Sequence, residues 1–305
     1  MKKILKNEDG NVLVIVAVFM IALFGFTAMV VDAGGLFLEK SKLQKALDAA
    51  VLAGAQDLIS SETKAKQTAM LIADKNNFKL TTSDLKTGPD YIQATKTISK
   101  GLTFAKILGI NSSEVKAFSK AIVGGSLISS KGVVPVGVLS KEYKANGKYI
   151  MHFQPGNPDN AAKSGNFGFL DLTEEKGNNL KNEIINGAEL KVSDDMHSWT
   201  QTGLQWGNVK AGFEARISAD KNAGRTYCEN ASTADDSCKR VIIVPMVEDF
   251  DGASGTSEVK IVGFAMFWIE SVDKHAITGQ FIKEISIGEF GTGKDFGIYK
   301  VSLIE

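Results

Sequence analysis

The sequence has no excess of charge of either sign. Its 305 residues include 35 basic and 35 acidic side chains, so the formal net charge is zero at pH 7. A protein that binds nucleic acid through the phosphates normally presents a basic surface. We therefore expect no nucleic-acid partner.

Several common catalytic motifs are also missing. The sequence contains no Gly-x-Ser-x-Gly elbow, no His-Glu-x-x-His zinc pair and no Gly-rich phosphate-binding loop ending in Gly-Lys-Ser/Thr. The three histidines, His152, His197 and His275, are too widely spaced to form a ligand pattern. These absences disfavour a hydrolase or transferase, and we expect no catalytic residues, no cofactor and no metal.

Cysteine is scarce as well, because the chain has only Cys228 and Cys238. In an oxidising compartment the pair would close a short loop, which the chain-entropy model values at roughly 3 kcal/mol. Two free thiols are the alternative, and a metal site would need further ligands nearby. We predict a disulfide between the two cysteines.

The most informative feature that is present is an uncharged run over residues 11–31, NVLVIVAVFMIALFGFTAMVV. A helix of this run is roughly 31 Å long, about the thickness of the hydrocarbon core of a bilayer. A cleaved signal would have an apolar middle of only about 7–15 residues and a small-residue cleavage site. A soluble core helix would need a polar face. We predict a retained transmembrane helix over residues 11–32.

Lysines lie on both sides of this run. Three are within the first six residues and three more lie between residues 40 and 45. The short first segment would have to cross the membrane in the opposite topology, whereas long C-terminal domains translocate largely regardless of charge. We predict a cytoplasmic tail at residues 1–10, with the part of the chain that follows the span outside the cell membrane.

The helical pattern continues beyond the run, to about residue 59. Small residues recur every fourth position at Ala46, Ala50 and Gly54, which lets another backbone approach closely. The face could pack on its own domain, as one stripe of a surface helix normally does. We predict that it is a contact face for other helices, including further copies of the chain.

The remainder predicts an α+β protein with two regions after the span. Residues 33–123 read as a stalk helix and a small α/β unit, with a second helix over 61–77, a strand over 91–97 and a short helix over 103–108. Residues 124–132, GGSLISSKG, have linker composition. Residues 133–305 read as a β-rich domain with strands at 133–139, 149–154, 167–172, 240–247, 258–269, 276–285 and 298–304, and helices at 179–186 and 208–218.

Two groups in the β-rich domain are candidate binding residues. Glu248, Asp249 and Asp251 are weak candidates for a hard cation, although a solvated hairpin loop has the same composition. Trp199 and Trp206 are candidates for a sugar- or partner-binding surface, although Trp is usually packed.

Three patterns in residues 8–57 are specific. They are the acidic start Glu8-Asp9-Gly10, the exit Val31-Asp32-x-Gly34, and the stalk Leu43-Gln44-x-Ala46-x-Asp48-Ala49-Ala50 that ends in Ala53-Gly54-Ala55. Together they resemble the N-terminal module of TadE/TadG-like proteins of bacterial tight-adherence (Flp) pilus systems. The likeness continues in residues 104–121 and 241–270 and in the ending VSLIE.

The resemblance implies a membrane-anchored, non-enzymatic assembly factor or minor-pilin-like component of such a system. Its implied partners are the membrane and other tight-adherence pilus proteins or pilins. An anchored surface or sensing protein that recognises a glycan or peptide through the β-rich domain is the alternative.

Two departures from the family patterns limit what the resemblance implies. Ile15 stands at the fifth position after Gly10, where prepilins carry Glu, so we expect no cleavage there. The Asp-x-Ser-x-Ser signature of metal-dependent adhesion is missing, so we expect no such adhesion.

Overall fold

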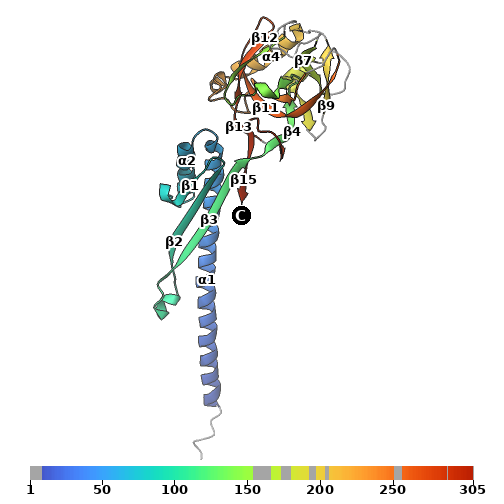
Figure 1. Cartoon of the computed structure of the whole chain (residues 1–305). Coiled ribbons are helices and arrows are strands. Elements are labelled where there is room, and N and C mark those ends of the chain that lie inside the picture. Colours follow the sequence, from blue (N-terminus) through green and yellow to red (C-terminus); the bar gives the residue numbers. More distant parts are fainter. Residues whose placement is uncertain are drawn as a thin grey trace, which may run out of the picture. The chain divides into compact units, whose positions relative to one another are not determined.

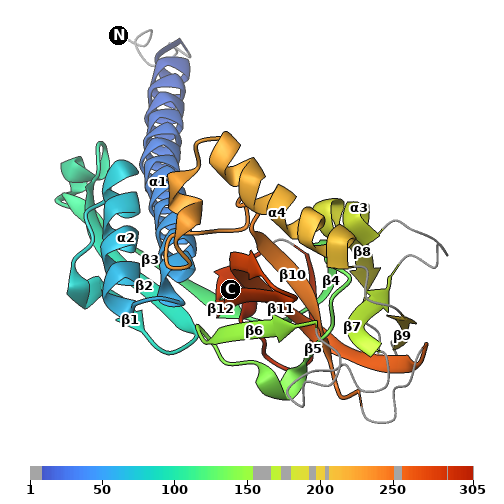
Figure 2. The same cartoon turned by 90° about the horizontal axis from the view of Figure 1, so that it is seen from above.

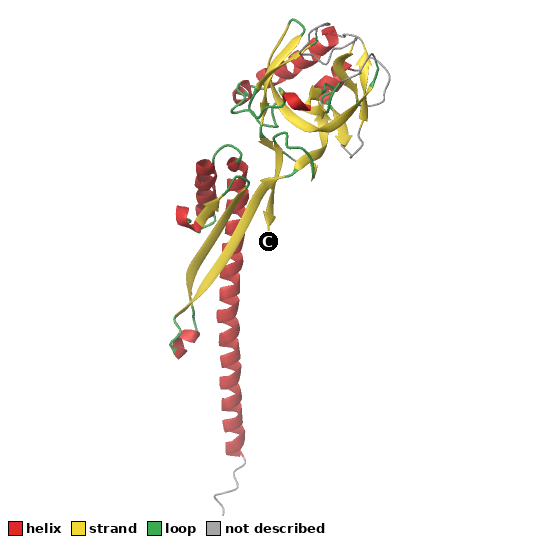
Figure 3. Cartoon of the chain, viewed as in Figure 1, coloured by secondary structure: helices red, strands yellow, loops and turns green. Residues whose placement is uncertain are grey.

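The structure is a computed structural model. It describes residues 9–153, 166–172, 180–191, 197–202, 206–250, 256–286 and 288–304. The chain divides into two compact units, which we call unit 1 (Met1–Ile122 with Ser302–Glu305) and unit 2 (Val123–Val301). A long helix in unit 1 and a strand-rich unit 2 confirm the α+β class (Figure 3).

Unit 1 is built on one long helix, α1 (Asp9–Leu58) (Figure 1). No proline interrupts these 50 residues, and most of them are apolar or small. Gly34 and Gly35 lie within the helix without breaking it. The predicted membrane span and the predicted stalk are therefore one continuous element.

A second helix, α2 (Glu62–Lys75), packs on the C-terminal part of α1. Ser61 caps its N-terminus, because the Ser61 hydroxyl accepts a hydrogen bond from the backbone N–H of Lys64 at 3.4 Å. The buried residues of α2 are all alanines, Ala65, Ala69 and Ala73. Small side chains on this face allow the two helices to approach closely.

Three antiparallel strands complete the part of unit 1 that precedes residue 122. They are β1 (Leu85–Thr87), β2 (Tyr91–Gly101) and β3 (Ser112–Gly124), in the order β1-β2-β3. The long β2–β3 hairpin runs beside α1 (Figure 1), and a short 3₁₀ helix, η2 (Ala105–Leu108), forms its tip. The sequence pattern predicts β2 and the short helix but not β3.

Unit 2 contains a mixed sheet in the order β14-β4-β10-β11-β12-β6, with shorter strands added at its sides. Strand β5 pairs with β10, β8 pairs with β4, and β9 pairs with both β11 and β7. The strands of this sheet and its additions are β4 (Ser126–Val133), β5 (Val138–Leu139), β6 (Lys148–His152), β7 (Asn166–Asp171), β8 (Ala188–Lys191), β9 (His197–Thr202), β10 (Val241–Val247), β11 (Glu258–Asp273), β12 (Ala276–Ile282) and β14 (Glu289–Gly291). Strand β13 (Glu284–Ile285) lies outside this sheet and pairs in parallel with β15 (Ile298–Ile304).

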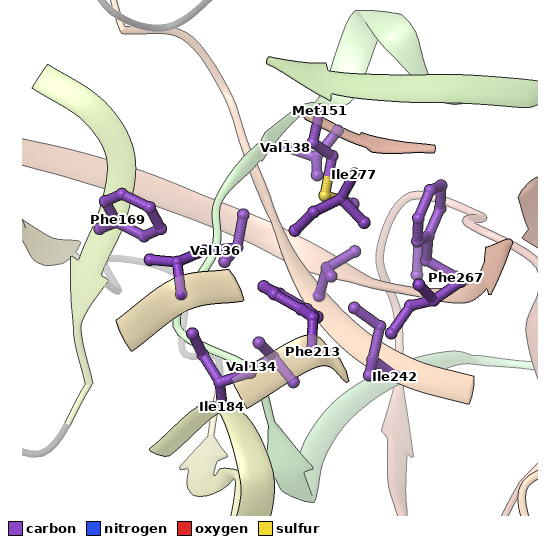
Figure 4. Packing of buried hydrophobic residues seen from close by; sticks show 14 of the residues in the cluster. Val134, Val136, Val138, Met151, Phe169, Ile184, Phe213, Ile242, Phe267 and Ile277 are labelled. Carbon is purple, nitrogen blue, oxygen red and sulfur yellow. The ribbon is translucent and has the colours of Figure 1, made fainter. Parts of the chain in front are cut away.

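Two helices, α3 (Leu180–Asn186) and α4 (Trp206–Asn222), lie side by side in unit 2 (Figure 2). Their apolar side chains close one side of a buried core, where Ile184 and Phe213 meet residues from the strands such as Ile242 (Figure 4). The core holds each of these three side chains at 1% exposure or less.

The linker predicted over residues 124–132 is wrong. Most of it forms β4, which pairs with β8, β10 and β14, and its Leu127 and Ser130 are buried. Gly125 and Gly132 adopt left-handed backbone with φ of +86° and +78°. The glycines therefore allow local bends in a paired strand. The Gly- and Ser-rich composition hides the alternation of buried and exposed side chains that would predict this strand from the sequence.

Candidate functional site

The N-terminal part of α1 presents apolar side chains on all its sides. None of residues 12–31 is buried, and Ile15, Phe24 and Met29 are 67%, 66% and 72% exposed. The hydroxyl of Thr27 donates to the carbonyl of Leu23 at 2.9 Å, so its one polar side chain is already hydrogen-bonded. By length and composition this helix could cross a membrane.

Asp32, the first charged residue after the run, holds the tip of the β2–β3 hairpin. Its carboxylate accepts hydrogen bonds from three successive backbone N–H groups, those of Thr103 (2.7 Å), Phe104 (3.0 Å) and Ala105 (2.7 Å). These N–H groups open a 3₁₀ turn and have no partner within it. The sequence marks Asp32 as the end of the span but does not reveal this contact.

Two further contacts tie the hairpin to α1 farther from the tip. Lys100 on β2 pairs with Glu39 at 3.3 Å, and the Gln44 side-chain amide donates to the carbonyl of Phe118 at 2.7 Å. The hairpin is therefore fixed to the helix at three levels, from residue 32 to residue 44.

The predicted helix-packing interface is occupied within unit 1. Ala46 and Ala50 are 1% and 0% exposed. A Cβ atom added to Gly54 would lie 2.8 Å from the carbonyl oxygen of Ala65 and 2.9 Å from Cδ1 of Ile92. These three residues are covered within unit 1, in part by α2, so the face packs on its own unit, which is the alternative that the spacing left open.

Comparison with known proteins bears on this helix alone. Residues 10–57 match the family model Tad, described as "Putative Flp pilus-assembly TadE/G-like". No curated protein and no solved structure matches the chain. The TadE/G-like segment begins and ends within α1, which confirms the resemblance inferred from the sequence over the helix.

The two tryptophans of unit 2 have different environments. Trp199 lies on β9 and is 52% exposed. Trp206 begins α4, and its ring centroid lies 5.8 Å from that of Phe153 and 5.1 Å from that of His275. Trp206 is thus packed against the core. Of the two tryptophans predicted to form one binding surface, only Trp199 is exposed.

The predicted acidic group is only partly within the described residues. Glu248 and Asp249 are exposed after the end of β10, whereas Asp251 lies outside the described residues. Within the described ranges, no three His, Cys, Asp or Glu side chains come together as a metal site.

The predicted disulfide between Cys228 and Cys238 is present. It crosslinks the segment between α4 and β10, and both cysteines are buried. The indole N–H of Trp268 donates to the carbonyl of Cys228 at 2.8 Å, and the Arg240 guanidinium lies 5.7 Å from the centre of the Trp268 ring. The crosslinked loop is thereby joined to β11.

A cavity of about 650 Å³ in unit 2 is a candidate site that the sequence does not predict. Its lining comes from strands β4, β8, β10, β11 and β14, from helices α3 and α4 and from the crosslinked loop. Its charged members are Lys131, Glu189, Arg216, Asp236, Lys239 and Glu289. Lys131 pairs with Glu189 at 3.4 Å across neighbouring strands. The lining can therefore offer both donors and acceptors to a polar ligand.

Arg216 at this cavity holds the surrounding chain together. It donates to the carbonyl of Ile184 through Nε and to that of Lys239 through Nη1 at 2.9 Å. Burial lowers the pKa of Arg216 to about 10 despite the opposing charge of Asp220. Asp220 accepts from the backbone N–H groups of Lys239 and Arg240, both at 2.8 Å. The guanidinium remains charged at neutral pH.

Proposed function

We propose that the protein is a membrane-anchored, non-enzymatic component of a bacterial tight-adherence pilus system, either an assembly factor or a minor-pilin-like protein. The proposal rests on two findings that concern the same residues. The TadE/G-like match covers residues 10–57, and the same stretch is a helix whose residues 12–31 are apolar and unburied.

The proposed topology places residues 1–10 in the cytoplasm, residues 11–32 in the membrane and residues 33–305 outside. A disulfide supports this orientation, because such bonds persist mainly in oxidising compartments. Ile15 at the fifth position after Gly10 supports a helix that keeps its N-terminus and remains in the membrane.

Association with pilus proteins then involves surfaces other than Ala46, Ala50 and Gly54, which are covered within unit 1. Lateral contact between copies would use the unburied residues 12–31 in the membrane. In lipid such contact is driven by packing and interhelical hydrogen bonds, since the lipid tails are as apolar as the side chains.

Genetic complementation tests this role. Deletion of the gene should abolish or strongly reduce surface pili, and the full chain should restore them. A variant in which a cleavable export signal replaces residues 1–32 should be secreted with its disulfide formed and should not restore pili. A second variant carries an unrelated apolar helix over residues 11–31. It should restore pili if these residues only anchor the protein, and it should not restore them if they make specific contacts with other helices. Unchanged piliation of the deletion strain would contradict the proposal.

A second candidate function is recognition of a glycan or peptide by unit 2. The charged cavity and the exposed Trp199 favour it. Binding of glycan and peptide arrays by the full chain in detergent would test it. Loss of the signal in Lys131→Ala, with retention in Lys181→Ala on α3, would locate the site at the cavity.

A further inference from the structure

The tip of the β2–β3 hairpin exposes large apolar side chains. Ile107 and Leu108 are 84% and 81% exposed, and Ile110 and Phe104 are 53% and 39% exposed. Consecutive bare aliphatic residues at the end of a hairpin are costly in water and usually mark a contact surface. The contacts within unit 1 do not cover them.

The position of this tip along α1 is fixed by Asp32. Its carboxylate binds the N–H groups of Thr103, Phe104 and Ala105, so the tip lies level with the point where the uncharged run ends. About 20 residues of helix cross the hydrocarbon core, which corresponds to residues 12–31. The tip then lies at the boundary between hydrocarbon and headgroups.

The apolar surface of α1 also continues past this level. Phe37 and Leu38, which follow Asp32 by less than two turns, are 76% and 54% exposed. Helix and hairpin thus both present apolar side chains over the same short distance. This distance is comparable to the depth of the headgroup region of a bilayer.

Charge beside the tip suits a headgroup layer. Lys106 is exposed and directly precedes Ile107, and Lys100 lies on the tip side of β2, where it pairs with Glu39. A lysine next to aliphatic residues can extend its ammonium group to lipid phosphates while the aliphatic residues enter the apolar layer. Asp32 itself is satisfied by backbone N–H groups.

We propose that the hairpin tip, residues 102–111, is a second membrane contact that inserts Ile107 and Leu108 into the interface of the bilayer crossed by α1. The occupant is lipid of the outer leaflet. The contact would hold unit 1 against the membrane and restrict tilt and rotation of α1. This inference rests on the anchoring proposed above.

Fluorescence of the full chain in vesicles of phosphatidylethanolamine and phosphatidylglycerol tests the contact. A single cysteine that carries an environment-sensitive dye is introduced as Ile107→Cys, Phe24→Cys or Leu71→Cys, while the native cysteines stay in their disulfide. All three positions are exposed, so labelling should not disturb packing. Leu71 on α2 is the water-exposed control, and Phe24 reports insertion of α1.

The expected result is blue-shifted emission at residues 107 and 24, with strong quenching of residue 107 by lipids that carry a shallow nitroxide. Residue 71 should remain unshifted and unquenched. A dye at 107 that reports water while residue 24 reports lipid would overturn this inference and leave the anchor intact. Water at both positions would overturn the anchor as well. A blue shift at 107 without lipid quenching would assign the tip to a protein contact and overturn the lipid assignment.

Asp32→Ala in the Ile107→Cys background tests the positioning role of the carboxylate. Loss of its hydrogen bonds should reduce quenching at residue 107 and leave quenching at residue 24 unchanged. Unchanged quenching at 107 would show that Asp32 does not hold the tip at the interface.

Discussion

The two halves of α1 are both rich in apolar residues but differ in what surrounds them. Residues 12–31 have no buried member. In residues 43–58 one face is fully covered by α2 and β2, and its buried members are Leu43, Ala46, Leu47, Ala50, Val51, Ala55 and Leu58. Apolar content alone therefore does not tell where a helix belongs.

What separates the halves is the distribution of charge around the helix. The first half has no charged residue between Asn11 and Val31, so every direction is equally apolar. The stretch from residue 40 to residue 58 places Lys40, Lys42 and Lys45 on exposed positions while its other face is buried. A helix that is apolar on all sides needs an apolar environment on every side, in a membrane or a protein core, whereas a helix with one apolar face can be covered by its own domain.

An aspartate introduced into each half should give the largest effects, on folding stability in the covered half and on membrane insertion in the uncovered half. Leu47→Asp places a carboxylate where Leu47 is 0% exposed and should destabilise unit 1 by more than about 4 kcal/mol. Leu23→Asp should leave unit 1 folded but cost about 3 kcal/mol of membrane insertion. Protease resistance of unit 1 and extraction from membranes at alkaline pH measure the two effects. Equal loss of folding in both variants would contradict the division of the helix.

Glycine substitutions should give a smaller effect with the same contrast. In Gly54→Leu the new side chain meets the carbonyl oxygen of Ala65, a backbone atom that cannot rotate away, and we expect a loss of about 3 kcal/mol in folding stability. Gly34→Leu is the matched control, because a Cβ atom there meets nothing within 4 Å. Thermal unfolding of the detergent-solubilised chain compares them. A stable Gly54→Leu variant would mean that α2 does not cover this face.

Acidification should lower the folding stability that the covered half gains from its contact with α2, and this effect should be the smallest of the three. Partial burial acts to raise the pKa of Asp57, but its bonds to Lys64 and Thr68 outweigh burial and hold the pKa below its ordinary value of 3.8. The ionised group therefore contributes stability above pH 3.8, and this contribution is lost as the pH falls through the lower, folded-state pKa. We expect a loss of about 1 kcal/mol, since the pair is partly exposed.

Unfolding of the wild type and of Asp57→Asn at pH 6 and below pH 3 measures this term. The difference between the two pH values should shrink in Asp57→Asn. It should keep its wild-type size in Asp74→Asn, which changes an exposed position of α2. An unchanged pH dependence in Asp57→Asn would remove Asp57 from the α1–α2 contact.

Features that depend on one segment were predictable from the sequence. The uncharged run, the helix that follows it and the crosslinked cysteines are all local patterns. The small-residue face of Ala46, Ala50 and Gly54 was also visible, but spacing cannot say whether the approaching backbone comes from the same chain or another. That answer depends on Ala65 and Ile92, which belong to other elements.

Features that depend on contacts distant in sequence were not predictable. The inward positions of β3 include Ala117, Ser119 and Ala121, which are too small to give a strong alternating pattern. The link from Asp32 to residues 103–105 spans more than 70 positions, and its donors are backbone N–H groups that leave no trace in the sequence. The cavity in unit 2 is likewise formed by segments far apart in the sequence, which only the fold brings together.

The last residues of the chain, Ser302–Glu305, belong to unit 1, although residues 123–301 form unit 2. Unit 2 is therefore an insertion, and the chain enters and leaves it through two connections. This has a practical consequence for dissection of the protein. Truncation after residue 122 would remove a piece of unit 1 together with all of unit 2, whereas replacement of residues 123–301 by a short linker would retain both pieces of unit 1.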